Sequence, residues 1–287
     1  MNRDILTVIQ ENMATFSKGQ KRIANYILES YDKAAFMTAS KLGKTVDVSE
    51  STVVRFASEL GYDGYPSMQK SLQKMIRNRF TSVQRIEVSY DRIGDQDVLT
   101  SVLQSDIEKI RLTLEEVDHQ SFDNAVDAIV KGRKIYIIGV RSAASIATFL
   151  HFYFNLIFDN VVMVAATTAS EVYENLIKVG PEDVVIGVSF PRYSSSTVHA
   201  MRFAKDQGAT TIAITDSEAS PLATISSFTL KARSDMASFV DSLVAPLSLV
   251  NALLVAVSRK KDEELSHTFQ KLEKIWDEYG VYEKVQD

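Results

Sequence analysis

Side chains that bind anions are concentrated in a loop that follows an apolar run of the chain. Residues 184–188 are apolar, and after them come Ser189, Phe190, Pro191, Arg192, Tyr193, Ser194, Ser195, Ser196 and Thr197. Hydroxyls and free backbone N–H groups at a helix start suit phosphate oxygens, and an arginine adds a charged fork. The candidate phosphate ligands are therefore Ser189, Arg192, Tyr193, Ser194 and Ser195. Ser194 also has a simpler interpretation, as the N-cap of the following helix.

A second loop of the same chemistry follows the apolar run that begins at Ile135. Gly139 permits a tight turn, and Arg141 and Ser142 stand immediately before a helical pattern. A glycine turn, a hydroxyl and a helix N-terminus together form an anion site. Two such loops favour a binding site over two unrelated capping serines. The chain has neither a GxGxxG nor a P-loop motif, so no nucleotide cofactor is expected.

Catalysis on a sugar would require a general base and a general acid beside the substrate. His151 and His199 fall inside predicted helices, where a structural role is the expectation. Glu171 follows Thr167 and Thr168 at a helix start, where it could contact sugar hydroxyls or simply favour the helix dipole. Without a convincing acid–base pair, a binding domain is favoured over an enzyme and no catalytic residue is assigned. The chain has no cysteine, and we expect no metal site.

The elements that would hold these loops alternate between short apolar runs and helical patterns. This order is typical of β-α-β units with a parallel sheet buried on both faces. The predicted strands are 135–140, 161–166, 184–190, 211–215 and 227–232, and helices over 239–257 and at the C-terminus follow. Open parallel sheets bind ligands at the carboxyl ends of their strands, where the strand order reverses. Both anion-binding loops follow predicted strands and would lie at that edge.

A helix is predicted over Val98–Val117, and its apolar residues recur every three or four positions. They are Leu99, Leu103, Ile107, Ile110, Leu114 and Val117. The preferred interpretation is that this stripe packs against its own domain. The alternative is a helix–helix contact between subunits.

The first 80 residues have the pattern of an all-helical domain with a helix-turn-helix. A helix over Thr38–Thr45, the turn 46–48 and a second helix that begins after Ser49 form the motif. Second helices of this kind read base edges in the major groove, and other side chains contact phosphates. The candidate DNA contacts are Lys41, Lys44, Ser49, Ser51, Thr52, Arg55 and Ser58.

Charge and composition support two parts of different character. The chain of 287 residues has a net charge of −5, which taken alone argues weakly against nucleic acid. Residues 1–85, however, hold 13 basic and 8 acidic side chains, so this part is +5 and the remainder is −10. A basic head on an acidic body favours a nucleic-acid-binding module joined to another domain. The start lacks a signal-like apolar region and no run of about 18 apolar residues exists, so we expect a cytoplasmic protein without a membrane partner.

The residues of the helix-turn-helix resemble a known family. Val48–Tyr62 is similar to the second-helix signature of the RpiR family of bacterial transcriptional regulators, and Gly64-Tyr65 continues the match. The segment Ile23–Ile27 is also similar to the N-terminal domain of that family. Gly43 stands where the family usually has alanine, and Asp47 where it usually has the turn glycine. Aspartate tolerates the left-handed conformation better than most residues, so the turn is expected to form.

Residues of about 120 to 260 resemble a sugar isomerase (SIS) domain, the usual partner of that N-terminal domain. The segment 189–194 aligns with the family loop Ser-x-Ser-Gly-x-Thr, and 204–209, 212–216 and 220–223 also match. Pro191 and Arg192 replace the second serine and the glycine of that loop, and Ala143 stands where a second serine often follows Ser142. This implies a variant phosphosugar pocket.

The sequence therefore predicts an α/β protein with an all-helical head and a flavodoxin-like, parallel α-β-α body. The expected parts are a DNA-binding domain over 1–80, a linker over 81–97 and a sugar-phosphate-binding domain over 98–287. The predicted function is a regulator of sugar metabolism that works as a homodimer or homotetramer on double-stranded DNA, with a sugar phosphate as its effector. The alternatives are a sugar-phosphate isomerase with a helical appendage and a sugar-phosphate-binding partner protein without DNA.

Overall fold

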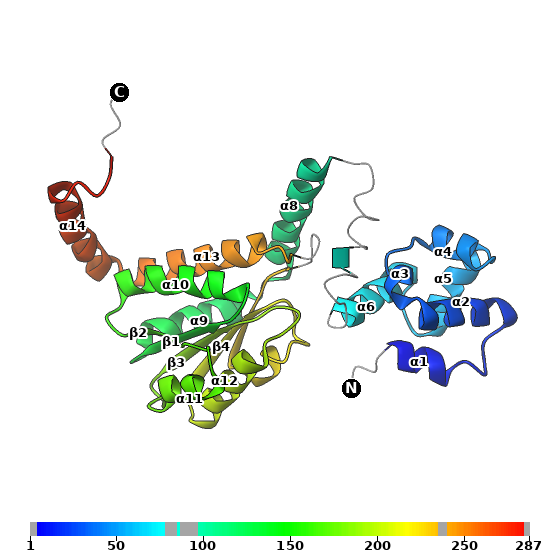
Figure 1. The fold of residues 1–287 in the computed structure, drawn as a ribbon, viewed down its shortest axis with the longest axis horizontal. Helices are drawn as coiled ribbons and strands as arrows, with labels where there is room; N and C mark the ends of the chain where they lie inside the picture. Colours follow the sequence, from blue (N-terminus) through cyan, green and yellow to red (C-terminus); the bar gives the residue numbers. More distant parts are fainter. Residues whose placement is uncertain (1–4, 78–84, 87–96, 235–239, 284–287) are drawn as a thin grey trace. The chain divides into compact units, whose positions relative to one another are not determined.

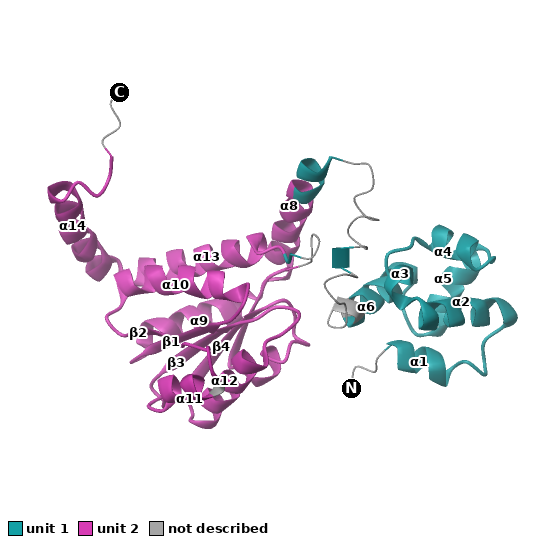
Figure 2. Ribbon diagram, viewed as in Figure 1, with its two compact units in different colours: residues 1–102, 236–241 teal, residues 103–235, 242–287 magenta. Residues whose placement is uncertain are grey.

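Figure 1 shows the computed structural model of the chain, which describes residues 5–77, 85–86, 97–234 and 240–283. The chain separates into two compact units, which are described one at a time (Figure 2). Unit 1 comprises Met1–Val102 with Met236–Asp241, and unit 2 comprises Leu103–Asp235 with Ser242–Asp287. Most of the predicted linker, 81–97, lies outside the described residues, so the domain limits given above remain predictions.

Unit 1 is built from short helices around one apolar core. Its helices are α1 (Ile5–Glu11), α2 (Lys18–Glu29), α3 (Tyr31–Ala34), α4 (Ala39–Thr45), α5 (Glu50–Glu59) and α6 (Tyr65–Arg77). Helix α2 begins with a capping box, in which the Ser17 hydroxyl accepts the Gln20 N–H and the Gln20 side chain accepts the Ser17 N–H. The rings of Phe16 and Phe56 meet in the core, 5.1 Å apart between centroids.

Unit 2 alternates strands and helices. Its elements are α8 (Val98–Glu116, whose first turn belongs to unit 1), α9 (His119–Lys131), β1 (Ile135–Gly139), α10 (Ala143–Ile157), β2 (Val161–Met163), α11 (Ala169–Leu176), β3 (Val184–Val188), α12 (Ser195–Asp206), β4 (Thr210–Thr215), β5 (Phe228–Lys231), α13 (Val244–Lys260) and α14 (Asp262–Glu278). A 3₁₀ turn, η1, covers Ala223–Ile225. The predicted fold class is confirmed. The predicted start of the long helix, Phe239, lies outside the described residues.

The sheet of unit 2 is parallel, with the strand order β2-β1-β3-β4-β5. Side chains alternate between its faces: Ile135 and Ile137 of β1 pack with α9, α10 and α13, whereas Tyr136 and Ile138 pack with α11 and α12. The order reverses between β1 and β3, which makes their carboxyl ends the topological switch point. Gly139 pairs with Val188 there, so the loops after the two strands start side by side.

Helix α8 contacts the rest of unit 2 through polar side chains. The Ser242 hydroxyl donates to Asp106 at 2.6 Å, and the buried Thr113 hydroxyl accepts the Arg233 N–H at 2.9 Å. Within the helix, the buried Lys109 also donates to Asp106, at 3.0 Å. The apolar residues of the opposite side are exposed: Leu99, Leu103, Ile107, Ile110 and Leu114. Val117, just after the helix, does pack against the core. The preferred interpretation, that the stripe packs against its own domain, is therefore wrong for these five residues.

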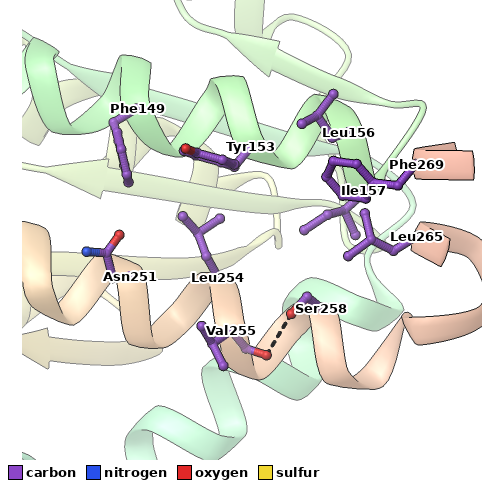
Figure 3. A pocket seen from close by; sticks show the side chains of 10 residues that line it. All are labelled: Phe149, Tyr153, Leu156, Ile157, Asn251, Leu254, Val255, Ser258, Leu265 and Phe269. Carbon is purple, nitrogen blue, oxygen red and sulfur yellow. Dashed lines mark hydrogen bonds between the residues drawn. The ribbon is translucent and has the colours of Figure 1, made fainter. Parts of the chain in front are cut away.

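An apolar groove of about 300 Å³ lies between α10, α13 and α14 (Figure 3). It is lined by Phe149, Tyr153, Leu156, Ile157, Asn251, Leu254, Val255, Ser258, Leu265 and Phe269. The Ser258 hydroxyl donates to the Val255 carbonyl of its own helix, 2.9 Å away. None of these lining residues is charged, so the groove does not suit a phosphate. None of the helices within the described ranges is long and apolar enough to cross a bilayer.

Candidate functional site

The helix-turn-helix of unit 1 forms from two capped helices. Helix α4 begins after Thr38, whose hydroxyl accepts the Lys41 N–H at 3.2 Å. Helix α5 begins after Ser49, whose hydroxyl accepts the Thr52 N–H at 3.2 Å. Ser49 is therefore the N-cap that the sequence predicts, and its side chain is already occupied by the helix that it starts.

The turn between α4 and α5 accounts for both departures from the family pattern. Asp47 adopts a left-handed conformation with φ 53°, and its carboxylate pairs with Arg22 at 2.9 Å. Gly43 is buried, and a Cβ at this position would lie 2.8 Å from the carbonyl oxygen of Val48. Glycine thus permits the close approach of α4 to the turn.

The outward face of α5 carries the predicted DNA contacts. Val53, Phe56 and Ala57 point into the core of unit 1. The side chains of Ser51, Arg55 and Ser58 are exposed, and so are Lys41 and Lys44 on α4. Arginine and lysine at such positions supply base and phosphate contacts respectively.

Thr52 differs from the other predicted contacts on α5. Its side chain is half-buried, and its hydroxyl lies 2.8 Å from that of Ser49. Its methyl group also faces α2, because a Cβ built on Gly19 would lie 3.5 Å from it. Thr52 therefore helps to seat the start of α5 on α2.

The loop after β1 brings Arg141 and Ser142 to the carboxyl edge of the sheet of unit 2. A Cβ on Gly139 would lie 2.8 Å from the Ala143 carbonyl oxygen and 2.9 Å from the Ala147 Cβ, so only glycine lets α10 start so close to β1. Arg141 adopts a left-handed conformation with φ 58°. Ser142 occupies the N-cap position of α10, yet its hydroxyl makes no capping hydrogen bond there. Both side chains are exposed.

The loop after β3 is held by its own hydroxyls. The buried Ser189 donates its N–H to the Ile214 carbonyl at 3.1 Å, and its hydroxyl accepts the Ser194 N–H at 3.1 Å. Ser194 caps α12 by accepting the Thr197 N–H at 3.4 Å. The structure thus shows Ser194 as the N-cap of α12. Ser189 holds the loop through its hydrogen bonds to the Ile214 carbonyl and the Ser194 N–H.

A residue just after β4, Asp216, also holds this loop, and the sequence did not single it out. The Tyr193 hydroxyl donates to the carboxylate of Asp216 at 2.7 Å, and Asp216 is buried. Thr215, the last residue of β4, donates to the Ser220 hydroxyl at 2.8 Å. The available signal was a Thr-Asp pair directly after an apolar strand. Arg192 and Ser195 remain exposed on this tethered loop.

Thr197 and Glu171 occupy the starts of two helices at this edge. Thr197 is fully buried, and its hydroxyl has no hydrogen-bond partner among the described residues. Glu171 lies in the first turn of α11, where its carboxylate accepts the Thr167 N–H at 3.1 Å and its own N–H donates to Thr168 at 3.2 Å. These bonds support the helix-start interpretation of Glu171 over a contact with sugar hydroxyls.

The histidines lie on helices. His151 is half-buried on α10, and the Asn155 amide nitrogen lies 3.0 Å from its Nε2. His199 is exposed on α12. Within the described ranges no three acidic or histidine side chains are grouped so that they could hold a metal ion.

Two family models match this chain. The model described as a helix-turn-helix domain of the rpiR family matches residues 3–79, and the SIS domain model matches residues 128–256. The chain belongs to the RpiR family. An HTH-type transcriptional regulator of Caldanaerobacter subterraneus subsp. tengcongensis is 25% identical over 90% of this chain and 92% of its own length. An HTH-type transcriptional regulator of Haemophilus influenzae is 26% identical over 88% of this chain and 90% of its own length.

Two solved structures have the same fold. The sugar isomerase domain of an RpiR transcription factor from Sphaerobacter thermophilus has a TM-score of 0.60 and 27% identity, over 62% of this chain and 99% of that one. The Vibrio vulnificus NanR protein, complexed with ManNAc-6P, has a TM-score of 0.59 and 22% identity, over 96% of this chain and 98% of that one. The relatives confirm the prediction of a helix-turn-helix transcriptional regulator rather than an enzyme.

Proposed function

We propose that this RpiR-family regulator binds an operator through the exposed face of α5 and releases or engages it in response to a sugar phosphate. The effector would bind at the carboxyl edge of the SIS sheet. The pairing of Gly139 with Val188 carries this proposal, because it starts two anion-binding loops side by side at the switch point. The proposed domain limits are 1–80 for the head, 81–97 for the linker and 98–287 for the body.

Within this site the exposed side chains would make the effector contacts. Arg141 and Arg192 supply positive charge in a body whose net charge is negative, and the Ser142 hydroxyl is not used as a cap. Ser189, Tyr193 and Ser194 would act differently, by holding the backbone of the loop. ManNAc-6P in the structure of NanR is a ligand of the proposed class.

The head would contact DNA as part of a homodimer or homotetramer. Single helix-turn-helix heads recognise one half-site, and two-fold symmetry pairs two heads with a palindromic operator. The effector acts by binding one arrangement of the heads more tightly than another. The regulator would work in the bacterial cytoplasm, where its DNA lies.

A thermal-shift screen with a panel of sugar phosphates tests the effector. A ligand that binds the folded state raises its stability by about 2.7 kcal/mol at a hundredfold excess over Kd. The proposal expects one phosphorylated sugar to raise the melting temperature while the parent sugar does not. No response to any phosphosugar, or turnover of an aldose or ketose phosphate, would contradict it. The active compound should then change operator mobility in a gel shift.

Two serine variants distinguish a residue that contacts the effector from one that stabilises the loop. Ser142→Ala removes a hydroxyl that caps nothing, so it should weaken the effector response without lowering the melting temperature of the free protein. Ser194→Ala removes the cap of α12, so it should blunt the response and also destabilise unit 2 by about 1 kcal/mol. Both variants should bind the operator as the wild type does. A normal effector response in Ser142→Ala would remove this residue from the site.

A further inference from the structure

One large apolar side chain lies on the outward face of α5. Of the valine, leucine, isoleucine, methionine and aromatic side chains described between residues 5 and 73, only that of Val54 is exposed, at 40%. Val53 is fully buried in the core of unit 1, whereas Val54 is neither part of that core nor among the partly buried residues packed against it. An apolar side chain in water gains free energy from any contact that covers it, so Val54 is a candidate contact residue.

Val54 lies at the centre of the face that carries the proposed DNA contacts. Ser51 precedes it by three positions and Ser58 follows it by four, which places the three side chains on one face of the helix. Both serines are bonded locally. The Ser51 hydroxyl lies 2.9 Å from that of Ser49, and the Ser58 hydroxyl donates to the Val54 carbonyl at 3.4 Å. The face therefore offers DNA the apolar surface of Val54 beside the charge of Arg55.

The major groove contains an apolar group that suits such a side chain. Each base pair displays a distinct pattern of hydrogen-bond donors and acceptors there, and the C5 methyl group of thymine is the apolar part of that pattern. Phosphates are contacted by polar and charged groups, which valine lacks. Contact between the thymine methyl group and an aliphatic side chain removes both from water, and burial of one methyl group changes an affinity by about fourfold.

We propose that Val54 contacts the C5 methyl group of a thymine in each operator half-site, beside the base pair that Arg55 contacts. Arginine selects guanine through the O6 and N7 atoms of that base, so the half-site should contain a thymine and a guanine in neighbouring base pairs. This inference rests on the proposed function, because it requires α5 to lie in the major groove. It adds the base that Val54 selects.

Replacement of thymine by deoxyuridine tests this contact, because it removes only the C5 methyl group and keeps the base pairing. The full-length protein first selects its preferred duplex from a pool of random sequences. Each thymine of the half-site is then replaced in turn. The Kd of every duplex is measured by fluorescence anisotropy at one salt concentration, since salt alone changes the affinity for DNA.

Two valine variants accompany the wild type. Val54→Ser replaces the apolar group by a hydroxyl, and Val244→Ser makes the same change at a valine of equal exposure, 40%, at the start of α13. Serine and valine have similar helix propensities and both positions are exposed, so neither variant should change the melting temperature.

The wild type and Val244→Ser should each lose about fourfold in affinity per half-site when one particular thymine is replaced. Val54→Ser should bind the thymine and deoxyuridine duplexes with affinities that differ by less than about 1.5-fold, because its hydroxymethyl group gains little from the methyl group. A half-site without thymine, thymines that can all be replaced without loss, or a Val54→Ser protein that keeps the preference for thymine would overturn the proposal. A protein that selects no duplex would instead overturn the proposed function, and this inference with it.

Discussion

Replacement of Gly139 by alanine probes the point where β1 meets the loop that we propose binds the effector. The added Cβ would lie 2.8 Å from the Ala143 carbonyl oxygen, 2.9 Å from the Ala147 Cβ and 3.2 Å from the Ala143 carbonyl carbon. Two of these atoms belong to the backbone of α10, so no flexible side chain can move aside. The whole start of α10, with Arg141 and Ser142 in front of it, would have to shift by several tenths of an ångström.

The size of the effect follows from two opposing terms. Overpacking of a tight interior costs about 1–3 kcal/mol. Loss of glycine from the unfolded chain stabilises by about 0.4–1 kcal/mol where alanine fits without strain. Gly180 provides the matched control, because nothing lies within 4 Å of a Cβ built there. Both variants share the unfolded-state term, so their difference isolates the contact at Gly139, about 1–3 kcal/mol in favour of Gly180→Ala.

Thermal unfolding followed by circular dichroism measures this difference. For a unit of this size, 1 kcal/mol corresponds to about 2–4 °C in melting temperature, so Gly139→Ala should melt roughly 2–12 °C below Gly180→Ala. It should also show a smaller thermal shift with the effector, because the loop that we propose binds the phosphate would be displaced. Equal melting temperatures and equal effector shifts in the two variants would refute the close approach of α10 to β1.

Three further variants test the head and the loop after β3. Arg55→Ala should weaken operator binding by about 1–3 kcal/mol in a gel shift. Arg202→Ala removes the same charge from the exposed side of α12 and should leave operator binding unchanged. Equal losses of affinity in the two variants would show that Arg55 makes no specific contact with DNA. Tyr193→Phe leaves the buried Asp216 with one bond fewer, which should lower the unfolding free energy of unit 2 by about 1.5–3 kcal/mol in urea. Burial raises the pKa of Tyr65 to about 12 from 10.0, so the neutral phenol is favoured in the folded state. Unit 1 should therefore lose about 2 kcal/mol of stability as the pH rises from 10 to 12, and a Tyr65→Phe variant with the same alkaline loss would contradict this assignment.

The strands and the helix-turn-helix could be predicted because their signals are local. Each strand is a short apolar run, and Ser49 and Ser194 cap the helices that the pattern places after them. The left-handed conformation of Asp47 also follows from its residue type and its place in a turn.

The remaining features depend on contacts between segments distant in the sequence. The periodicity of α8 reveals an apolar stripe but does not say which side faces the domain, since Arg233 and Ser242 decide that from more than 100 residues away. The same holds for Gly43, whose small size matters only because the Val48 carbonyl lies against it. Asp216 contacts the loop after β3 through its hydrogen bond with Tyr193, and the spacing of these two residues along the chain does not predict that bond.

The loop after β3 separates the residues that shape it from the residues that it displays. Ser189, Ser194 and the Tyr193–Asp216 bond fix the backbone, while Arg192 and Ser195 project from it without taking part in these bonds. Under the proposed function, substitutions at the displayed positions would therefore alter which ligand is preferred at little cost to folding. In the proposed site, a change of effector would then require the exchange of only one or two surface side chains on a loop whose backbone stays the same.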